Sequence, residues 1–276
     1  MLECATHVVS VARGVTYPQA IVLGAVQGLT EFLPISSSGH LILVPRLFGW
    51  PDQGLAFDAA IHLGTLAALV AYFRAELLAF VSGALSRRLA ALLLLGTVPA
   101  ALAGLLLEGA VESRLRSPVV VAAATAFWGV VMGLADRGAR PPSPGDREPL
   151  ERVRIVEAVV IGCAQAVALV PGTSRSGITI TAGLLAGLDR ATAARFSFLL
   201  GIPITALAGL AKAADVARVG AGSAEAGPLA AAVLAAFVSG WVAVWFLVGF
   251  LRRRSLMPFV LYRLALAAAI AAIALA

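Results

Sequence analysis

The segment QGLTEFLPISSSGH, residues 27–40, gathers a carboxylate, hydroxyls and an imidazole within fourteen positions. Gln27 and Glu31 are four residues apart, so they share one face of a helix. Three consecutive hydroxyls follow, on Ser36, Ser37 and Ser38. Such a set could supply a base or metal ligand from Glu31, a nucleophile from a serine and a proton carrier from His40. The alternative is that the serines only cap a helix and that His40 is a packed polar residue.

A second polar segment, PGTSRSG at residues 171–177, has the residue types that bind anions. Arg175 presents a fork of donors that fits phosphate oxygens. A helix N-terminus after these turn-forming glycines would add backbone N–H groups. The other candidate substrate-binding residues of this segment are Thr173, Ser174, Ser176 and Gly177, and those of the first segment are Gln27, Ser36 and Ser38. The anion would come from a ligand or from Glu31, and the alternative is a buried structural pair of Arg175 and Glu31.

Four more polar residues lie inside apolar stretches, where ionisable groups are costly and usually functional. Asp58 and His62 share a helix face by their four-residue spacing. They could hold a metal ion, Asp58 could orient the His62 ring, or both could make a polar contact between helices. Arg195 and Arg263 are each explained most simply by a side chain that reaches toward a lipid headgroup, and this interpretation is preferred for Arg195.

These residues belong to a chain of 276 residues that is 60% apolar and only 13% charged, with a mean hydropathy of +0.94. An ordinary soluble domain has roughly 45–50% apolar and about 25% charged residues. A disordered chain, a collagen and a nucleic-acid-binding domain are therefore excluded, and an all-α polytopic membrane protein is predicted. The formal charge of +6 is expected to set topology. The first ten residues have no basic segment ahead of an apolar core, so no cleavable signal peptide is expected.

Six stretches have the length of about 20 apolar residues that a spanning helix needs. They are residues 55–73, 89–107, 117–135, 191–211, 228–251 and 256–276. Two other apolar regions, 18–48 and 153–188, are interrupted by the two polar segments, and their arms are too short to cross a bilayer. Two re-entrant helical hairpins are predicted there, with turns that are buried in protein or line a wet cavity. The alternative is a pair of ordinary spans kinked at Pro34 and Pro171.

The two halves of the chain share one plan, a hairpin followed by three spans, with repeat 1 at about 17–135 and repeat 2 at about 153–276. When Gln27 is aligned with Gln165, the residues Ser36, Ser38 and Gly39 fall on Ser174, Ser176 and Gly177. Three spans between the hairpins make this an inverted-topology repeat, in which broken helices of both halves form a site near the midplane. Residues 136–152 are a polar, Pro-rich linker, expected in the cytoplasm within a single membrane domain of residues 1–276.

The basic residues predict the orientation of this domain. If successive spans cross the membrane in opposite directions, eleven Lys and Arg residues fall on one side and six on the other. Because cytoplasmic loops carry the excess of basic residues, the side with eleven is predicted to be cytoplasmic. The first hairpin then opens to the outside and the second to the cytoplasm. A midplane cavity between the two polar turns would suit a phosphorylated substrate with a long apolar tail.

Both polar segments resemble the signatures of a known family. QGLTEFLPISSSGH is similar to the (E/Q)xxxE and PxSSxGH signature of bacterial undecaprenyl-pyrophosphate phosphatases of the BacA type, which are linked to bacitracin resistance. PGTSRSG resembles their second signature, and PFVLYR at residues 258–263 also looks like the family. The resemblance covers essentially the whole chain.

This resemblance implies an enzyme that hydrolyses a C55 isoprenoid pyrophosphate to the monophosphate, the lipid carrier for peptidoglycan, at the outer face of the bacterial plasma membrane. It also implies a divalent cation, Mg²⁺ or Ca²⁺. The catalytic residues carried over are Glu31, Ser37, His40 and Arg175. Glu31 is the expected metal ligand. Gln27 stands where many members have Glu, and Gln27 and Asp58 are further candidate ligands.

Two mechanisms stay open on these residues. Either Ser37, assisted by His40, attacks the terminal phosphorus, or His40 activates water and Ser37 is only a ligand. The alternative function is a transporter or flippase of undecaprenyl phosphate, because inverted repeats with broken helices are also a transporter architecture. The expected partners are the isoprenoid pyrophosphate and membrane lipids, with no nucleic acid, and a homodimer is left open.

Overall fold

The computed structural model describes residues 15–51, 53–83, 87–115, 117–140, 149–219 and 226–275. These residues form helices and no strand, which confirms the all-α class. The expectation about the first ten residues falls outside the described part of the chain, as do residues 141–148 of the predicted linker.

Eleven α-helices follow one another along the described residues. They are α1 (Tyr17–Phe32), α2 (Ser37–Phe48), α3 (Gly54–Tyr72), α4 (Arg74–Val81), α5 (Arg87–Arg114), α6 (Pro118–Arg137), α7 (Ile155–Val167), α8 (Arg175–Leu185), α9 (Arg190–Val219), α10 (Ala226–Leu251) and α11 (Met257–Leu275), with a 3-10 helix at Pro149–Arg152 before α7. Five of them, α5, α6, α9, α10 and α11, are long and apolar enough to cross a membrane. α3 and α4 form a sixth candidate span that bends by 70° at its break. The chain is therefore a multi-pass membrane protein, with five candidate spans, or the predicted six if the bent pair counts as one.

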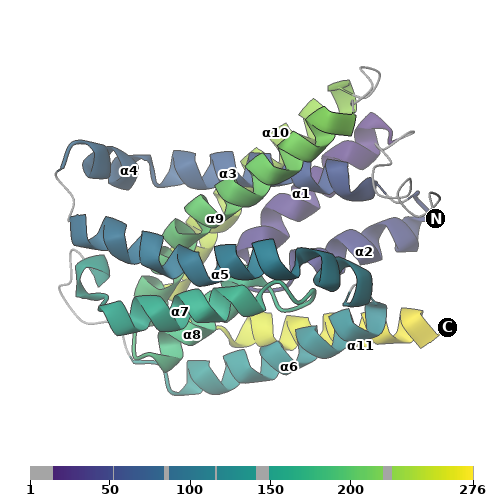
Figure 1. The fold of residues 1–276 in the computed structure, drawn as a ribbon. Coiled ribbons are helices and arrows are strands. Elements are labelled where there is room, and N and C mark those ends of the chain that lie inside the picture. Colours follow the sequence, from purple (N-terminus) through teal and green to yellow (C-terminus); the bar gives the residue numbers. More distant parts are fainter. Residues whose placement is uncertain are drawn as a thin grey trace.

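Two pairs of shorter helices stand at the predicted hairpins. α1 has 16 residues and α2 has 12, and α7 has 13 and α8 has 11. Each pair is separated by a non-helical turn, and its two helices contact each other. In Figure 1, α1 and α2 lie toward the end of the bundle at which α11 ends, whereas α7 and α8 lie toward the opposite end. This arrangement is the one expected of two hairpins that enter from opposite sides.

The helix boundaries recur in the second half with the same offset that aligns Gln27 with Gln165. α1 begins at residue 17 and α7 at 155, and α2 begins at 37 and α8 at 175. α5 and α6 correspond to α10 and α11 to within one residue at their starts, and the bent pair of α3 and α4 corresponds to the single long α9. Ser36 and Ser174, which correspond by this offset, are the non-glycine residues with positive φ in the described chain, at 74° and 68°. These correspondences are consistent with the predicted repeat.

Glycines bring each hairpin close to a spanning helix of the other half. A Cβ on Gly24 of α1 would lie 2.1 Å from the Ala232 carbonyl oxygen of α10. A Cβ on Gly162 of α7 would lie 2.4 Å from the Gly96 carbonyl oxygen of α5. Backbones can approach this closely only where there is no side chain. Both hairpins are thereby fixed at the interface between the two halves.

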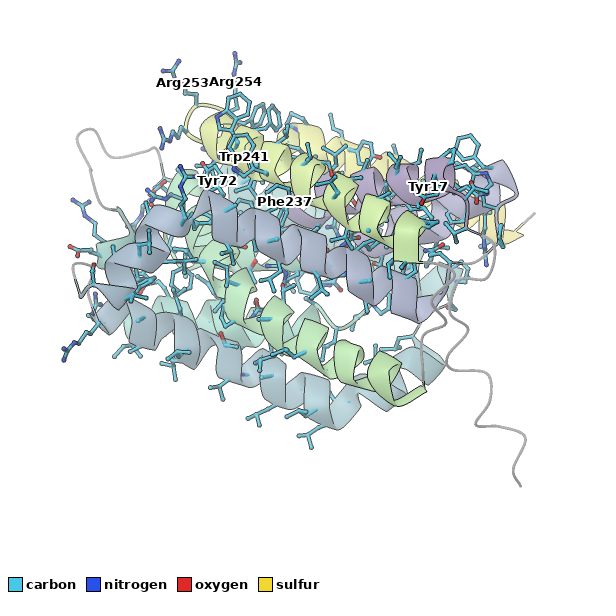
Figure 2. The ribbon with its side chains drawn as sticks, turned by 90° about the horizontal axis from the view of Figure 1, so that it is seen from above. Tyr17, Tyr72, Phe237, Trp241, Arg253 and Arg254 are labelled. Atoms are coloured by element: carbon cyan, nitrogen blue, oxygen red, sulfur yellow. The ribbon has the colours of Figure 1, made fainter. Side chains whose placement is uncertain are left out.

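Arginine side chains lie at one end of the bundle and also in an ion pair between two helices. Figure 2 shows Arg253 and Arg254 just beyond one end of α10, and Tyr17 toward the other end of the molecule. Arg195 of α9 donates to Glu76 Oε1 of α4 at 2.7 Å, so the expectation that it reaches toward a headgroup was wrong. The break between α3 and α4 brings the Glu76 carboxylate to it.

Candidate active site

The Glu31 carboxylate accepts hydrogen bonds from both hairpins. Its Oε2 accepts from Gln27 Nε2 at 3.1 Å and from Ser37 Oγ at 2.9 Å. Its Oε1 accepts from Arg175 Nη2 at 3.1 Å. The Glu31 and Arg175 side chains are only 10% and 13% exposed, so solvent screens this ion pair little. Four residues predicted from the two polar segments therefore meet at one point.

In both turns, a residue with positive φ precedes the residue whose side chain bonds to Glu31. α1 ends at Phe32, and the left-handed Ser36 precedes Ser37, the first residue of α2. Ser174 is likewise left-handed and precedes Arg175, the first residue of α8. This conformation is costly for a residue with a side chain, and such residues cluster at functional sites. The equivalent positions 37 and 175 thus supply a hydroxyl and a guanidinium to one carboxylate.

Two of the hydroxyls predicted to bind substrate connect the turns to each other. Ser38 Oγ accepts a hydrogen bond from the Gly172 N–H at 3.1 Å. Ser176 Oγ lies within hydrogen-bond distance of the backbone carbonyls of Glu31, at 3.2 Å, and Leu33, at 3.4 Å. These bonds cross from one half of the chain to the other, so they fix the position of the second turn relative to Glu31.

The remaining small polar residues of the turns make local contacts, cap a helix or are buried without a partner. Ser36 Oγ lies 3.2 Å from Ser38 Oγ. Ser174 Oγ accepts from the Gly177 N–H at 3.2 Å and so caps α8. Thr173 is fully buried, and its hydroxyl has no hydrogen-bond partner among the described residues.

His40 is held away from the proton that it was expected to take. Its Nδ1 lies 2.7 Å from the Ser36 carbonyl oxygen, and its Nε2 lies 2.7 Å from the Tyr262 hydroxyl, on whose ring it also stacks. A carbonyl only accepts, so Nδ1 carries the hydrogen and Nε2 accepts from Tyr262. Ser37 instead donates to Glu31, which makes Glu31 the base beside the hydroxyl.

The imidazole near Glu31 belongs to His62 of α3. Its Nε2 lies 3.7 Å from Glu31 Oε2, and its Nδ1 donates to the Asp58 carbonyl oxygen at 2.5 Å. Asp58 Oδ1 accepts from Gln53 Nε2 at 2.9 Å. The helix spacing that pairs Asp58 with His62 was visible in the sequence, but the approach of His62 to Glu31 depends on how α3 packs against α1.

Two buried polar atoms beside Glu31 show which ligands the site could take. Arg175 Nη1 has no hydrogen-bond partner among the described residues, and it is a donor that suits an anion. Gln27 Oε1 is also buried without a partner, and an amide oxygen next to a carboxylate suits a hard cation. The described residues contain no group of three His, Cys, Asp or Glu side chains placed to hold a metal ion, so a cation there would need ligands from the substrate or water.

Nearly the whole chain is similar to proteins of one family. Residues 20–269 match the family described as bacitracin resistance protein BacA. The chain belongs to the BacA family. It is 46% identical over 263 residues to the undecaprenyl-diphosphatase of Hahella chejuensis, which covers 92% of this chain and 96% of that protein. It is 49% identical over 261 residues to undecaprenyl-diphosphatase 2 of Stutzerimonas stutzeri, which covers 91% of this chain and 95% of that protein.

The BacA match extends into α11, where two residues that the sequence analysis did not assign to the site contact it. Tyr262 holds His40, and Arg263 is only 1% exposed and donates to backbone carbonyls of both turns. The expectation that Arg263 reaches toward a headgroup was therefore wrong, because the bundle interior supplies its acceptors. Two features of the sequence could have identified Arg263: it lies in an apolar span, and it ends the stretch PFVLYR.

Proposed function

We propose that this BacA family member is an integral membrane phosphatase that hydrolyses undecaprenyl diphosphate to undecaprenyl phosphate and phosphate. The reaction recycles the lipid carrier for cell-wall synthesis and confers bacitracin resistance. The observation that carries the proposal is the Ser37 hydroxyl bonded to Glu31, with Arg175 on the same carboxylate. The names of the relatives, undecaprenyl-diphosphatases, support the substrate.

Ser37 is the nucleophile of the first step. As its Oγ forms a bond to the terminal phosphorus, its proton passes to Glu31 Oε2, 2.9 Å away. The bridging P–O bond breaks and undecaprenyl phosphate leaves with the electron pair. Arg175 and the N–H groups of the first turn of α8 bind the phosphoryl oxygens and stabilise their charge.

Water completes the reaction at the phosphoserine. Its oxygen bonds to phosphorus, the bond from phosphorus to Ser37 Oγ breaks, and Glu31 returns its proton to that oxygen. The hydrogens of the water leave with the phosphate. His40 takes no proton in this scheme; it holds Ser36, and thereby the start of α2, through its Nδ1 hydrogen bond.

The divalent cation fits the oxygen atoms of Glu31 and Gln27. Mg²⁺ commonly takes one or two protein ligands and completes its shell with substrate phosphates and water. The Glu31 carboxylate and the unpartnered Gln27 Oε1 would hold it, and the ion would offset the charge of the pyrophosphate. Asp58 is not needed as a ligand, because its Oδ1 bonds to Gln53.

The site opens to the outer face of the bacterial inner membrane. Three consecutive arginines, 252–254, follow α10, and Figure 2 shows Arg253 and Arg254 at that end of the helix. The excess of basic residues on this side assigns it to the cytoplasm. The first hairpin lies toward the other end of the bundle, which supports access from outside (Figure 1). A homodimer stays a prediction.

Phosphate release from a prenyl pyrophosphate by detergent-purified protein tests the proposal. We expect release with Mg²⁺, none with EDTA, and loss of release in Glu31→Ala and Arg175→Ala. Arg190→Lys is the matched control, because Arg190 pairs with Asp136 away from the site. No release by folded wild-type protein with any divalent cation would overturn the phosphatase and make lipid transport in vesicles the next assay.

A further inference from the structure

Arg263 is the largest side chain that is fully buried among the described residues. Its Nε donates to the Thr125 carbonyl of α6 at 3.1 Å, and its Nη1 to the Pro34 carbonyl of the first turn at 3.4 Å. Its Nη2 donates to the carbonyls of Gly172 and Thr173 in the second turn, at 3.0 and 3.1 Å. One guanidinium from α11 therefore holds both turns that carry the candidate active site.

Backbone carbonyls, rather than a carboxylate, satisfy this buried charge. Arg154, Arg175, Arg190 and Arg195, in contrast, each pair with a carboxylate. A buried cation is tolerated only if it is hydrogen-bonded, so the carbonyl ends of the turns must face Arg263. The space for it comes from glycine, because a Cβ on Gly177 would lie 3.1 Å from Arg263 Nη1.

This bonding determines the direction of the peptide groups in the second turn. The peptide bonds of the described residues are trans, so the C=O and N–H of one unit point in opposite directions. The Thr173 carbonyl points to Arg263, and the N–H of Ser174 therefore points away from it. Arg175, which follows Ser174, reaches Glu31 in α1 and lies against Gly201 in α9. Arg263 thus binds the negative ends of the peptide dipoles that begin at Gly172 and Thr173.

A second donor supports the same carbonyl. Thr125 Oγ1 donates to the Gly172 carbonyl at 3.1 Å, and Arg263 Nη2 donates to it at 3.0 Å. Thr125 and Arg263 correspond by the offset that relates the two halves, so they occupy equivalent positions in α6 and α11. The two repeats therefore supply matching donors from opposite halves to one carbonyl of the second turn.

We propose that Arg263 is a positioning residue for the pyrophosphate: by binding the Thr173 carbonyl it turns the N–H of Ser174 toward the phosphates, and it adds a positive charge that no carboxylate among the described residues offsets. The proposal rests on the phosphatase function above. Arg263 does not touch the substrate; it acts through the turn and through Arg175. Its loss should weaken binding of the pyrophosphate more than it slows the attack by Ser37.

Two variants and one control test this role. Arg263→Lys keeps the charge, but a single ammonium cannot reach carbonyls of three segments as the guanidinium fork does. Thr125→Val keeps the shape of the side chain and removes one donor to Gly172. Arg190→Lys changes a cation that pairs with Asp136 outside the site. The dissociation constant of a prenyl methylenediphosphonate, which is not hydrolysed, is measured for each with Mg²⁺, beside KM, kcat and the midpoint of thermal unfolding.

We expect Thr125→Val to weaken binding of the analogue about fivefold, the effect of one hydrogen bond. Arg263→Lys should weaken it at least about tenfold, with the change in KM larger than the change in kcat. Arg190→Lys should bind as the wild type does. Wild-type affinity in folded Arg263→Lys and in Thr125→Val would overturn the role, and Thr125→Val alone decides if the lysine variant does not fold. A wild type that binds the analogue but hydrolyses nothing would overturn the phosphatase, while the series of dissociation constants still tests Arg263.

Discussion

The first hairpin, α1 and α2, and the second, α7 and α8, place different residues at positions that correspond in the repeat. The pairs are Gln27 with Gln165, Glu31 with Leu169, and Ser37 with Arg175. Leu169 cannot accept a hydrogen bond, and the buried amide of Gln165 has no partner among the described residues. A similar backbone therefore carries the proposed base and nucleophile in one half and the proposed anion-binding cation in the other.

The two hairpins also differ in their surroundings. α8 is buried from Ser176 to Leu184, with α6, α7 and α9 against it. In α2 the buried residues are Gly39, His40, Leu41 and Pro45, and its end exposes Leu47 and Phe48. In the proposed reaction, the second hairpin would thus hold the phosphates on a buried helix, and the first has exposed apolar residues at which a lipid tail could approach. An inverted repeat separates these tasks because its two turns meet in the interior while their outer surroundings are free to differ.

Removal of the acid from the first hairpin should have the largest effect. Glu31→Gln keeps the size of the side chain but removes the acceptor for Ser37 and the charge opposite Arg175. We expect kcat/KM to fall about a thousandfold or more, within the range for loss of a general base. Glu157→Gln is the control, because Glu157 is a buried acid of the second hairpin that bonds to Arg154. Equal losses in both variants would mean that the acids act on the fold and not on the reaction.

The second test separates the serines of the first turn. Ser37 donates to Glu31, whereas Ser38 accepts from the N–H of Gly172. Ser37→Ala should lower kcat at least about a hundredfold and abolish labelled phosphoenzyme in rapid quench, because the nucleophile is gone. Ser38→Ala should lower kcat about fivefold, the effect of one hydrogen bond, and still form phosphoenzyme. Trapped phosphate on Ser37→Ala protein would exclude Ser37 as the nucleophile.

The third test replaces the guanidinium of Arg175 in the second hairpin by an ammonium and so keeps the positive charge. In Arg175→Lys one ammonium must serve Glu31 and the phosphates, which the guanidinium reaches with different nitrogens. We expect kcat/KM to fall roughly a hundredfold, as for loss of one donor to a developing charge. Arg195→Lys is the control, since Arg195 pairs with Glu76 at the break between α3 and α4. Equal activity in Arg175→Lys and wild type would reduce Arg175 to a structural partner of Glu31.

The sequence predicted the helical class, the spans and the two broken regions because apolar length and turn residues are local signals. Apolar stretches of about 20 residues identify spans directly. The predicted span of residues 55–73 ends at the break, so the prediction included neither the bend nor the continuation of the chain into α4. The offset between the two halves was visible in four identities and fits the helix boundaries along both of them.

The membership of the site was predicted less completely, because it depends on contacts between distant helices. Glu31, Ser37 and Arg175 lie in recognisable polar turns, and the structure brings them together. His62 and Arg263 were noticed only as polar residues in apolar spans. No local spacing shows that α3 presents His62 to Glu31, or that α11 presents Arg263 to two turns that are far away in sequence.

The smallest expected effect concerns a hydrogen bond between α2 and α11 that has no counterpart at the second hairpin. His40 of α2 bonds to Tyr262, but their counterparts in the other half are Ile178 and Ala124, which cannot form this bond. At this position α8 has a buried apolar residue, Ile178, whereas the partly exposed α2 has a polar contact that keeps its first turn in place. Tyr262→Phe keeps the ring stack and removes the hydroxyl, so kcat/KM should fall about fivefold, the effect of one hydrogen bond. Tyr72→Phe is the matched control, and an unchanged Tyr262→Phe enzyme would show that α2 does not need this hydrogen bond to keep its first turn in place.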